Sequence, residues 1–346
     1  VQRALDPGTG IFPAEMTLGE LFQAAGYRTA LFGKWHLGGS PPSDPNSQGF
    51  DEVLGHRCGA IDNYSHYNYW GGPAPRHALW RDREPYREDG VFLPDLIVRE
   101  SRRFMERHRD RPFLLFVASN QPHYPLQPEP RFLSQYAHVL DPSRRAYGAA
   151  VTSLDDKVGQ IVRAIADLGL AQDTIVVFMS DNGHSLEPQA GGGGGSAGPF
   201  RGAKPTLWEG GIRVPSIVSW PGHIARGQVR DQMASAMDWL PTLARYCGID
   251  VSSLALDGRD LSGLIASPGA PSPHEVLHWM ILGTYWAVRE GRWKLLHRNE
   301  GRFLVDLEAD PGESANLASA RREVADRLQA RHEAWGLKPV YDAAQE

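Results

Sequence analysis

Residues 112–119 read PFLLFVAS, and residues 174–181 read TIVVFMSD. Each is a strand-length apolar run that ends in a small polar residue. Strands buried on both faces lose the apolar–polar alternation of half-buried strands, and they belong to parallel sheets that helices cover on both sides. Residues 29–35, TALFGKW, and 213–220, RVPSIVSW, have the same character. The four segments predict a mostly parallel central sheet.

Amphipathic helices are expected around these strands. Thr17-Leu-Gly-Glu20 fits a capping box and begins a short helix. Helical spacing of apolar residues predicts helices over about 94–109 and 145–168, and Gly248 can serve as the residue that follows the cap of a later helix. Residues 39–90 are rich in Gly, Pro, Asp and aromatic residues, which predicts a long irregular excursion. Alternating strands and helices indicate the α/β class.

The pattern changes after about residue 270. The segments EVLHWMIL, TYWAVRE, RWKLLHR and RFLVDL are short, partly alternating and separated by turn residues. They predict an antiparallel meander, which a last helix over about 319–335 covers. We therefore expect an α/β domain over residues 1–268 and a smaller antiparallel β subdomain with a terminal helix over residues 269–346.

Composition narrows the class of protein. The chain has 346 residues and a formal net charge of −5, with acids and bases mixed along it. This argues against general nucleic-acid binding, which needs a basic patch or stripe. The longest apolar runs are far shorter than the roughly 20 residues of a membrane span. The two cysteines, Cys58 and Cys247, cannot build a disulfide framework and form no C-x-x-C pair for zinc. The cysteine content therefore does not indicate the cellular compartment of the protein.

Polar side chains follow three of the predicted strands. In open α/β sheets, ligands bind beyond the carboxyl ends of the strands. Three polar clusters at three such ends therefore favour a functional site over three unrelated capped loops. The residues are Lys34 and His36 after the first strand, Asn120 and His123 after the second, and Asp181, Asn182 and His184 after the third.

Asp181 and Asn182 offer two adjacent oxygen ligands. Such ligands suit Ca²⁺ or Mg²⁺, whereas zinc prefers His and Cys. Calcium takes six to eight ligands, so the others must come from elsewhere in the protein, from water or from substrate.

The segment FRGAKPTLWEGGIRVP at 200–215 adds three cations, Arg201, Lys204 and Arg213, around Glu209. We assign Arg213 and Glu209 a structural role, and Lys204 is the better candidate to reach an anion. Cations, histidines and a hard metal together form a site for a tetrahedral, multiply charged oxyanion. Phosphate and sulfate esters both fit this description.

The chain resembles the formylglycine-dependent (type I, arylsulfatase-like) sulfatases of the alkaline-phosphatase-like superfamily. The matching stretches run in family order across nearly the whole chain. They are GYRTALFGKWHLG, GFDEVLG, PHYP, SDNGH, RGAKPTLWEGGIRVPSIVSWPG, MDWLPTLARYCGI, DGRDL, and WKL followed by DLEADPGESANLA.

This resemblance implies catalytic roles for four residues. Lys34 would contact the sulfate and the nucleophile. His36 would hydrogen-bond the nucleophile and help to break down the covalent sulfo-enzyme. His123 and Lys204 would stabilise or protonate the leaving oxygen.

The resemblance also implies a metal and a pocket. Asp181 and Asn182 would bind the divalent cation, usually Ca²⁺, with Mg²⁺ as the other option. The 56–70 stretch lies where the family often builds substrate contacts, so its side chains are pocket candidates, although they could equally serve packing. Our pocket candidates are His184, His56, Asp62 and Arg201.

One departure from the family pattern concerns the nucleophile. The family's nucleophile comes from a C-x-P/A-x-R motif oxidised to formylglycine, and metal-binding aspartates precede it. Neither Cys58 nor Cys247 lies in such a motif. Three explanations stay open: a fragment of an ordinary sulfatase, which we favour, one chain of a split enzyme whose partner chain supplies the segment, and a pseudoenzyme that binds sulfated ligands. A missing strand would leave an apolar sheet edge prone to pairing.

The expected function is hydrolysis of sulfate monoesters, either aryl sulfates or sulfated carbohydrates. The expected partner is thus a sulfated small molecule or glycan. The alternatives are an inactive binder of sulfated ligands and a phosphodiesterase or phosphonate hydrolase of the same superfamily. The family resemblance favours a periplasmic or secreted protein, and the sequence leaves the localisation unknown.

Overall fold

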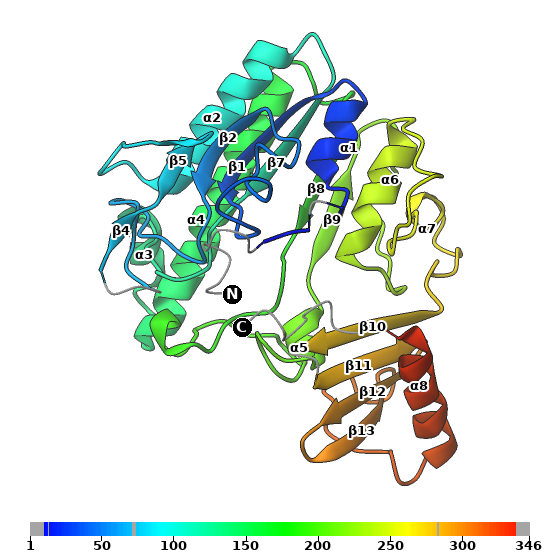
Figure 1. The fold of residues 1–346 in the computed structure, drawn as a ribbon. Coiled ribbons are helices and arrows are strands. Elements are labelled where there is room, and N and C mark those ends of the chain that lie inside the picture. The colour runs from blue at the N-terminus through cyan, green and yellow to red at the C-terminus, as the bar shows by residue number, and fades with distance from the viewer. Residues whose placement is uncertain (1–9, 13, 71–73, 282–283, 337–346) are drawn as a thin grey trace. The chain divides into compact units, whose positions relative to one another are not determined.

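The computed structural model describes residues 10–12, 14–70, 74–281 and 284–336 (Figure 1). The chain forms two compact units: unit 1 comprises Val1–Thr174 and Leu186–Gly195, and unit 2 comprises Ile175–Ser185 and Ser196–Glu346. The domain boundary predicted after residue 268 differs from this division and stays a prediction.

The helices and strands agree with most of the predicted segments. The helices are α1 (Leu18–Ala24), α2 (Leu93–His108), α3 (Pro130–Leu133), α4 (Pro142–Asp167), α5 (Glu209–Ile212), α6 (Trp239–Tyr246), α7 (Ser262–Ala266) and α8 (Arg322–Trp335). The strands are β1 (Arg28–Lys34), β2 (Glu52–His56), β3 (Tyr67–Asn68), β4 (Arg76–His77), β5 (Leu79–Arg81), β6 (Glu84–Pro85), β7 (Phe113–Ala118), β8 (Val176–Met179), β9 (Ser216–Ser219), β10 (Val276–Ile281), β11 (Tyr285–Glu290), β12 (Trp293–Arg298) and β13 (Gly301–Asp306).

Unit 1 is built on a five-stranded sheet with the order β6-β5-β2-β1-β7. The three strands β2, β1 and β7 run parallel, with Phe32 in register with Leu54 on one side and Val117 on the other. The α/β class and the mostly parallel central sheet are therefore confirmed. The expectation of an irregular excursion over residues 39–90 is wrong in one respect, because the strands β2 to β6 lie within it and three of them, β2, β5 and β6, belong to the central sheet. Its glycine and acidic residues hid a central strand.

Side chains alternate between the two faces of the sheet. Apolar residues of the parallel strands therefore project from both faces and need other apolar side chains to cover them. Ala30 and Phe32 of β1 face one side and pack in one cluster with Leu96 and Phe104 of α2. Leu31 points to the opposite side and packs with other buried side chains there. Helix α1 begins with the predicted capping box of Thr17 and Glu20.

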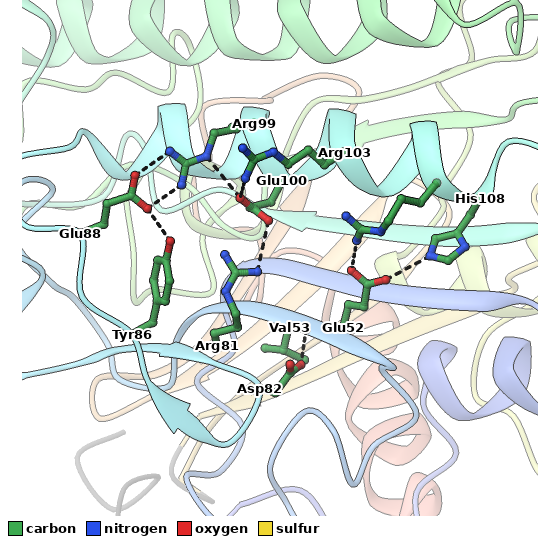
Figure 2. A network of polar contacts seen from close by, with 11 residues as sticks. Glu52, Val53, Arg81, Asp82, Tyr86, Glu88, Arg99, Glu100, Arg103 and His108 are labelled. Carbon is green, nitrogen blue, oxygen red and sulfur yellow. Dashed lines mark hydrogen bonds and ion pairs between the residues drawn. The ribbon is translucent and has the colours of Figure 1, made fainter.

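A network of ion pairs joins α2 to the sheet (Figure 2). Glu100 of α2 is 4% exposed, and its carboxylate accepts hydrogen bonds from Arg81 of β5 at 3.2 Å and from Arg103 at 3.0 Å. Glu52 of β2 binds His108 at the end of the same helix at 3.0 Å. A buried carboxylate is tolerated only when cations and donors compensate it, so the network fixes how α2 lies on the sheet.

Strand β7 is less buried than its apolar sequence predicts. In the part of the chain that the structure describes, β7 pairs only with β1, and none of its residues is fully buried. Phe116 is 42% exposed. The prediction of a strand buried on both faces is therefore wrong for β7 in this structure.

Strands β8 and β9 form a two-stranded antiparallel sheet in unit 2, with Val177 opposite Val218. We counted both segments among the strands of a mostly parallel central sheet, and for this pair that assignment is wrong. Apolar content cannot distinguish the two orientations, because the direction of a strand depends on the path of the connecting chain.

The C-terminal meander is confirmed. Strands β10 to β13 pair antiparallel in sequence order. On one face, Val288 and Leu295 pack with Leu328 of α8. On the other face, Leu296 packs with Trp208 of the 200–215 segment. In the described residues, no helix combines the length and the apolar character that a membrane crossing requires.

Unit 2 contains a buried charged cluster formed by Glu209, Lys294 and Glu313. The Lys294 ammonium is fully buried and lies 2.9 Å from a carboxylate oxygen of each glutamate. The glutamates are 3% and 0% exposed. Arg213, which the sequence suggested as the partner of Glu209, is 3.9 Å away. The structural role predicted for Glu209 is thus fulfilled mainly through Lys294.

Candidate active site

The carboxyl ends of β1 and β2 bring Lys34 beside His56. These two residues are partners in the parallel register, and the Trp35 amide donates to the His56 carbonyl at 2.9 Å. Strand β1 ends at Lys34, and His36 follows with a φ of 57°. A left-handed conformation is uncommon for a residue with a side chain and is typical of functional or strained positions. The alternation of side chains along a strand, which would put Lys34 and His36 on one face, therefore does not extend to His36.

The environment of His56 bears on the first polar cluster. His56 is fully buried, and its Nδ1 donates to the Cys58 carbonyl at 2.9 Å. Burial first, and then the charges of Lys34, His36 and His123, lower the pKa of His56 to about 3. These three side chains thus lie close enough to His56 to disfavour its protonation, as an electropositive cluster would.

His123 enters this cluster from the loop after β7. Its amide donates to the Asn120 carbonyl at 3.0 Å, and its Nδ1 lies 2.8 Å from the Tyr124 carbonyl. Asn120 is itself buried and donates to Asn63 at 2.6 Å. Because β2, β1 and β7 are parallel, their carboxyl ends meet at one edge of the sheet. This geometry brings together three candidates that lie up to 89 positions apart in the numbering.

The second group of candidates lies in unit 2. Asp181 and Asn182 follow β8, and the Lys204 amide donates to the His184 carbonyl at 2.9 Å. Gly183 is required between them, because a Cβ at this position would lie 1.9 Å from the Gly210 carbonyl oxygen. The loop therefore gathers Asp181, Asn182, His184 and Lys204 within one unit.

The donor set of this loop suits a hard divalent cation. Asp181 supplies an exposed carboxylate and Asn182 an amide oxygen. Among the described residues, the structure records no hydrogen bond or ion pair for the Asp181 carboxylate. An acidic side chain without a cationic partner beside an amide oxygen fits Ca²⁺ or Mg²⁺ chemistry.

Two pocket candidates have structural contacts of their own. The Asp62 carboxylate accepts hydrogen bonds from the Ser65 amide at 2.8 Å and from Gln127 at 2.6 Å. Burial opposes its ionisation, but these hydrogen bonds outweigh it and hold the pKa of Asp62 below its ordinary value. Arg201 stacks on Trp208 at 4.0 Å. A pocket role for Asp62, Arg201 and His184 stays a prediction.

The sequence underrated His56. It entered the prediction only as a pocket candidate, whereas the register of β1 and β2 places it beside Lys34. The signal was its position at the end of DEVLGH, which becomes readable once β2 is recognised as a strand.

Neither cysteine resembles an activated nucleophile. Cys58 is 2% exposed, and burial raises the pKa of its thiol. Cys247 is the C-cap of α6, and Gly248 follows it with a φ of 68°, as predicted for that helix end.

Comparison with known proteins places the chain. The family model for sulfatases matches residues 3–249, and a model described as N-sulphoglucosamine sulphohydrolase, C-terminal, matches residues 201–335. The chain belongs to the sulfatase family. Sulfatases are sulfuric ester hydrolases, and the family generally uses a formylglycine and a divalent metal.

Individual relatives agree with this assignment. Bovine (Bos taurus) arylsulfatase A is 34% identical over 95% of the chain and 72% of its own length. Pig (Sus scrofa) N-acetylgalactosamine-6-sulfatase is 38% identical over 73% of the chain and 49% of its own length. The crystal structure of Ps i-CgsB in complex with k-i-k-neocarrahexaose superposes with a TM-score of 0.86 at 26% identity, over 94% of this chain and 75% of that one.

Proposed function

We propose that this sulfatase-family chain acts on sulfate monoesters of aryl or carbohydrate compounds, and that Lys34, His36 and His123 form the anion-binding part of its site. The observation that carries the proposal is the cluster of these residues around the neutral, buried His56. A cation and imidazoles at the carboxyl edge of a parallel sheet make a positive pocket for a tetrahedral oxyanion. The names of the relatives, an arylsulfatase and an N-acetylgalactosamine-6-sulfatase, favour a sulfate over a phosphate ester.

The roles of the side chains follow from their chemistry. The Lys34 ammonium neutralises charge on the sulfate oxygens, as a compact point charge on a flexible stem can. His123 in its imidazolium form donates a proton to the leaving oxygen. His36 is held close to Lys34 and serves as the base or hydrogen-bond partner on the attacking side. Lys204 lies in unit 2, and the role that the family resemblance gives it, to stabilise the leaving oxygen, stays a prediction.

The family resemblance adds a metal and a nucleophile to this proposal. Asp181 and Asn182 would hold Ca²⁺, which withdraws charge from a sulfate oxygen when it is bound. The family's formylglycine provides the nucleophilic oxygen, and none of the 346 residues lies in a C-x-P/A-x-R motif. The turnover assay therefore adds a segment that carries this motif.

The test measures binding and turnover separately. Binding of inorganic sulfate to the chain is titrated calorimetrically, and sulfate release from an aryl sulfate is measured after a segment with the nucleophile motif is added. Lys34→Ala should weaken sulfate binding at least about tenfold, because a hydrogen bond to a charged group is worth about 1.5–3 kcal/mol. Arg109→Ala removes a 61% exposed cation from the same unit and serves as the control.

Equal affinities of wild type and Lys34→Ala would contradict the assignment of the anion site. Sulfate binding that depends on Lys34, without sulfate release in the supplemented chain, would instead identify a binder of sulfated ligands.

A further inference from the structure

A second cluster of potential metal ligands lies in unit 1, among residues that the proposed sulfatase chemistry does not use. His66, His77 and Asp89 each offer one ligand atom, and these atoms all lie within 4.8 Å of one another. His77 Nε2 is 3.7 Å from an oxygen of Asp89. Two imidazoles and one carboxylate at this separation are the kind of ligand set that binds transition-metal ions.

Both histidine side chains have a buried ring nitrogen without a hydrogen-bond partner among the described residues. His66 is 0% exposed, and its Nε2 donates to the Val91 carbonyl at 3.0 Å, because a carbonyl can only accept. The lone pair of His66 therefore resides on Nδ1, a buried atom for which no hydrogen-bond partner is present in the described residues. The side chain of His77 is 7% exposed, and within the same residues its buried Nε2 likewise lacks a hydrogen-bond partner.

Buried polar atoms in native proteins almost always have a partner, so two such nitrogens beside one carboxylate require an explanation. The hydrogen bond from His66 Nε2 to a backbone carbonyl is the arrangement that orients metal-bound histidines in proteins. His66 also adopts a φ of 60°, which a residue with a side chain rarely does outside functional or strained sites.

The three ligands come from segments that the backbone ties together. Tyr67 and His77 are partners in the β3–β4 pair, and the Ala78 amide donates to the His66 carbonyl at 2.9 Å. The Gly90 amide donates to the Tyr64 carbonyl at 2.8 Å and thereby fixes the segment that carries the third ligand.

The residue next to Asp89 is held firmly as well. Figure 2 shows Glu88 bound by Arg99 of α2 and by the hydroxyl of Tyr86. Both Arg99 contacts measure 2.6 Å. Helix α2 therefore anchors the chain on the N-terminal side of Asp89. The Asp89 side chain is 55% exposed, which leaves an ion from solvent a route to the two buried nitrogens.

We propose that His66, His77 and Asp89 form a binding site for a divalent transition-metal ion of the Zn²⁺ type. The two imidazole nitrogens and one carboxylate oxygen leave at least one coordination position for water, as in zinc sites with three protein ligands. The bound ion links the residue that precedes β3, strand β4 and the segment before α2. Its ligands differ in kind from Asp181 and Asn182, whose oxygens suit Ca²⁺.

Arg87 is the cation that competes with the metal for Asp89. Its guanidinium lies 3.8 Å from an Asp89 oxygen and is 59% exposed, so it can turn away to solvent. A metal that binds His77 replaces this weak, exposed contact with direct coordination.

The experiment uses the full chain after treatment with a chelator and exchange into buffer with excess Ca²⁺, so that oxygen-rich sites are filled. Zn²⁺ binding is measured calorimetrically, and Co²⁺ serves as a spectroscopic probe through its visible absorption. Wild type should bind one Zn²⁺ in the presence of Ca²⁺. Asp89→Asn and His77→Gln should each lower the Zn²⁺ affinity at least about tenfold and change the Co²⁺ spectrum.

Matched controls separate ligation from general effects. Asp110→Asn removes a 90% exposed carboxylate from the same unit, and His138→Gln removes an exposed imidazole. Both should bind Zn²⁺ like wild type. If His77→Gln does not fold, the exposed position of Asp89 leaves Asp89→Asn as the deciding variant.

The proposal is overturned if wild type binds no stoichiometric Zn²⁺ beside excess Ca²⁺. It is overturned too if Asp89→Asn binds Zn²⁺ as tightly as Asp110→Asn. Neither readout depends on sulfate release, so the outcome is independent of the proposed function.

Discussion

The buried charged cluster of unit 2 allows a quantitative prediction. Lys294→Met keeps the length of an unbranched side chain and removes the ammonium that lies 2.9 Å from both Glu209 and Glu313. Removing one partner of a buried ion pair costs about 3–5 kcal/mol, because the remaining charge is left without compensation in a poorly polar interior. We expect a loss of this size in the free energy of unfolding at neutral pH.

The nearby arginines compensate only part of this loss. Arg289 lies 3.7 Å from Glu209, beyond hydrogen-bonding distance. Glu313 accepts a hydrogen bond from the Glu209 amide at 2.6 Å, but within the described residues no second cation lies within ion-pair distance of its carboxylate. Glu313 is therefore the carboxylate that suffers most when Lys294 is removed.

The dependence on pH has a definite sign. Burial already raises the pKa of Glu313 above its ordinary value of 4.5, although Lys294 opposes the effect. Without Lys294 the pKa rises further, so the folded state binds a proton more readily than the unfolded state does. Stability from such a group is lost as pH rises from the unfolded to the folded pKa. The destabilisation by Lys294→Met should thus be smaller at pH 5 than at pH 7.5.

Urea unfolding followed by tryptophan fluorescence provides the assay. Arg213→Met is the matched control, because Arg213 is 46% exposed and 3.9 Å from the same Glu209. Such an exposed pair contributes about 0–1 kcal/mol. The reasoning is refuted if Lys294→Met and Arg213→Met shift the urea midpoint equally, or if the loss is the same at both pH values.

Three further predictions concern unit 1 and the loop that carries Asp181 and Asn182. Glu100→Gln should lower the free energy of unfolding by about 1–2 kcal/mol, because it weakens charge-assisted hydrogen bonds to a buried carboxylate. The control Glu106→Gln changes an exposed helical ion pair and should cost under about 0.5 kcal/mol. The midpoints of urea unfolding compare the two variants. The pKa of His56 is about 3 in the folded state, against 6.5 for an ordinary histidine. Between these two values the unfolded state binds one more proton, so the free energy of unfolding should decrease as the pH is lowered from 6.5 to 3. An NMR titration in which the His56 ring protonates above about pH 5 would contradict this. Gly183→Ala should lower Ca²⁺ affinity, because its Cβ would meet the Gly210 carbonyl at 1.9 Å; calorimetry with unchanged affinity would count against the loop as the metal site.

The sequence predicted the elements whose signals are local. The capping box at Thr17 and Glu20, the apolar periodicity of α4 and the alternation in β10–β13 all depend on residues within a few positions of one another. Each pattern contains its own physical cause, so no knowledge of the rest of the chain was needed. The strand-end rule depends on topology alone, because parallel strands bring their carboxyl ends to one edge whatever the details of packing. The site roles that we assigned with this rule stay predictions.

Tertiary structure decided the features that depend on distant partners. Strand β2 forms a central strand because β1 and β5 pair with it on both sides, despite its weak apolar pattern. Lys294 is buried only because Glu209, 85 residues away, meets it. His66, His77 and Asp89 come together through backbone pairing between short segments. Their spacing in the sequence matches no metal-binding motif. The loops between these residues set the distances between the ligand atoms, so the spacing along the chain does not predict the site.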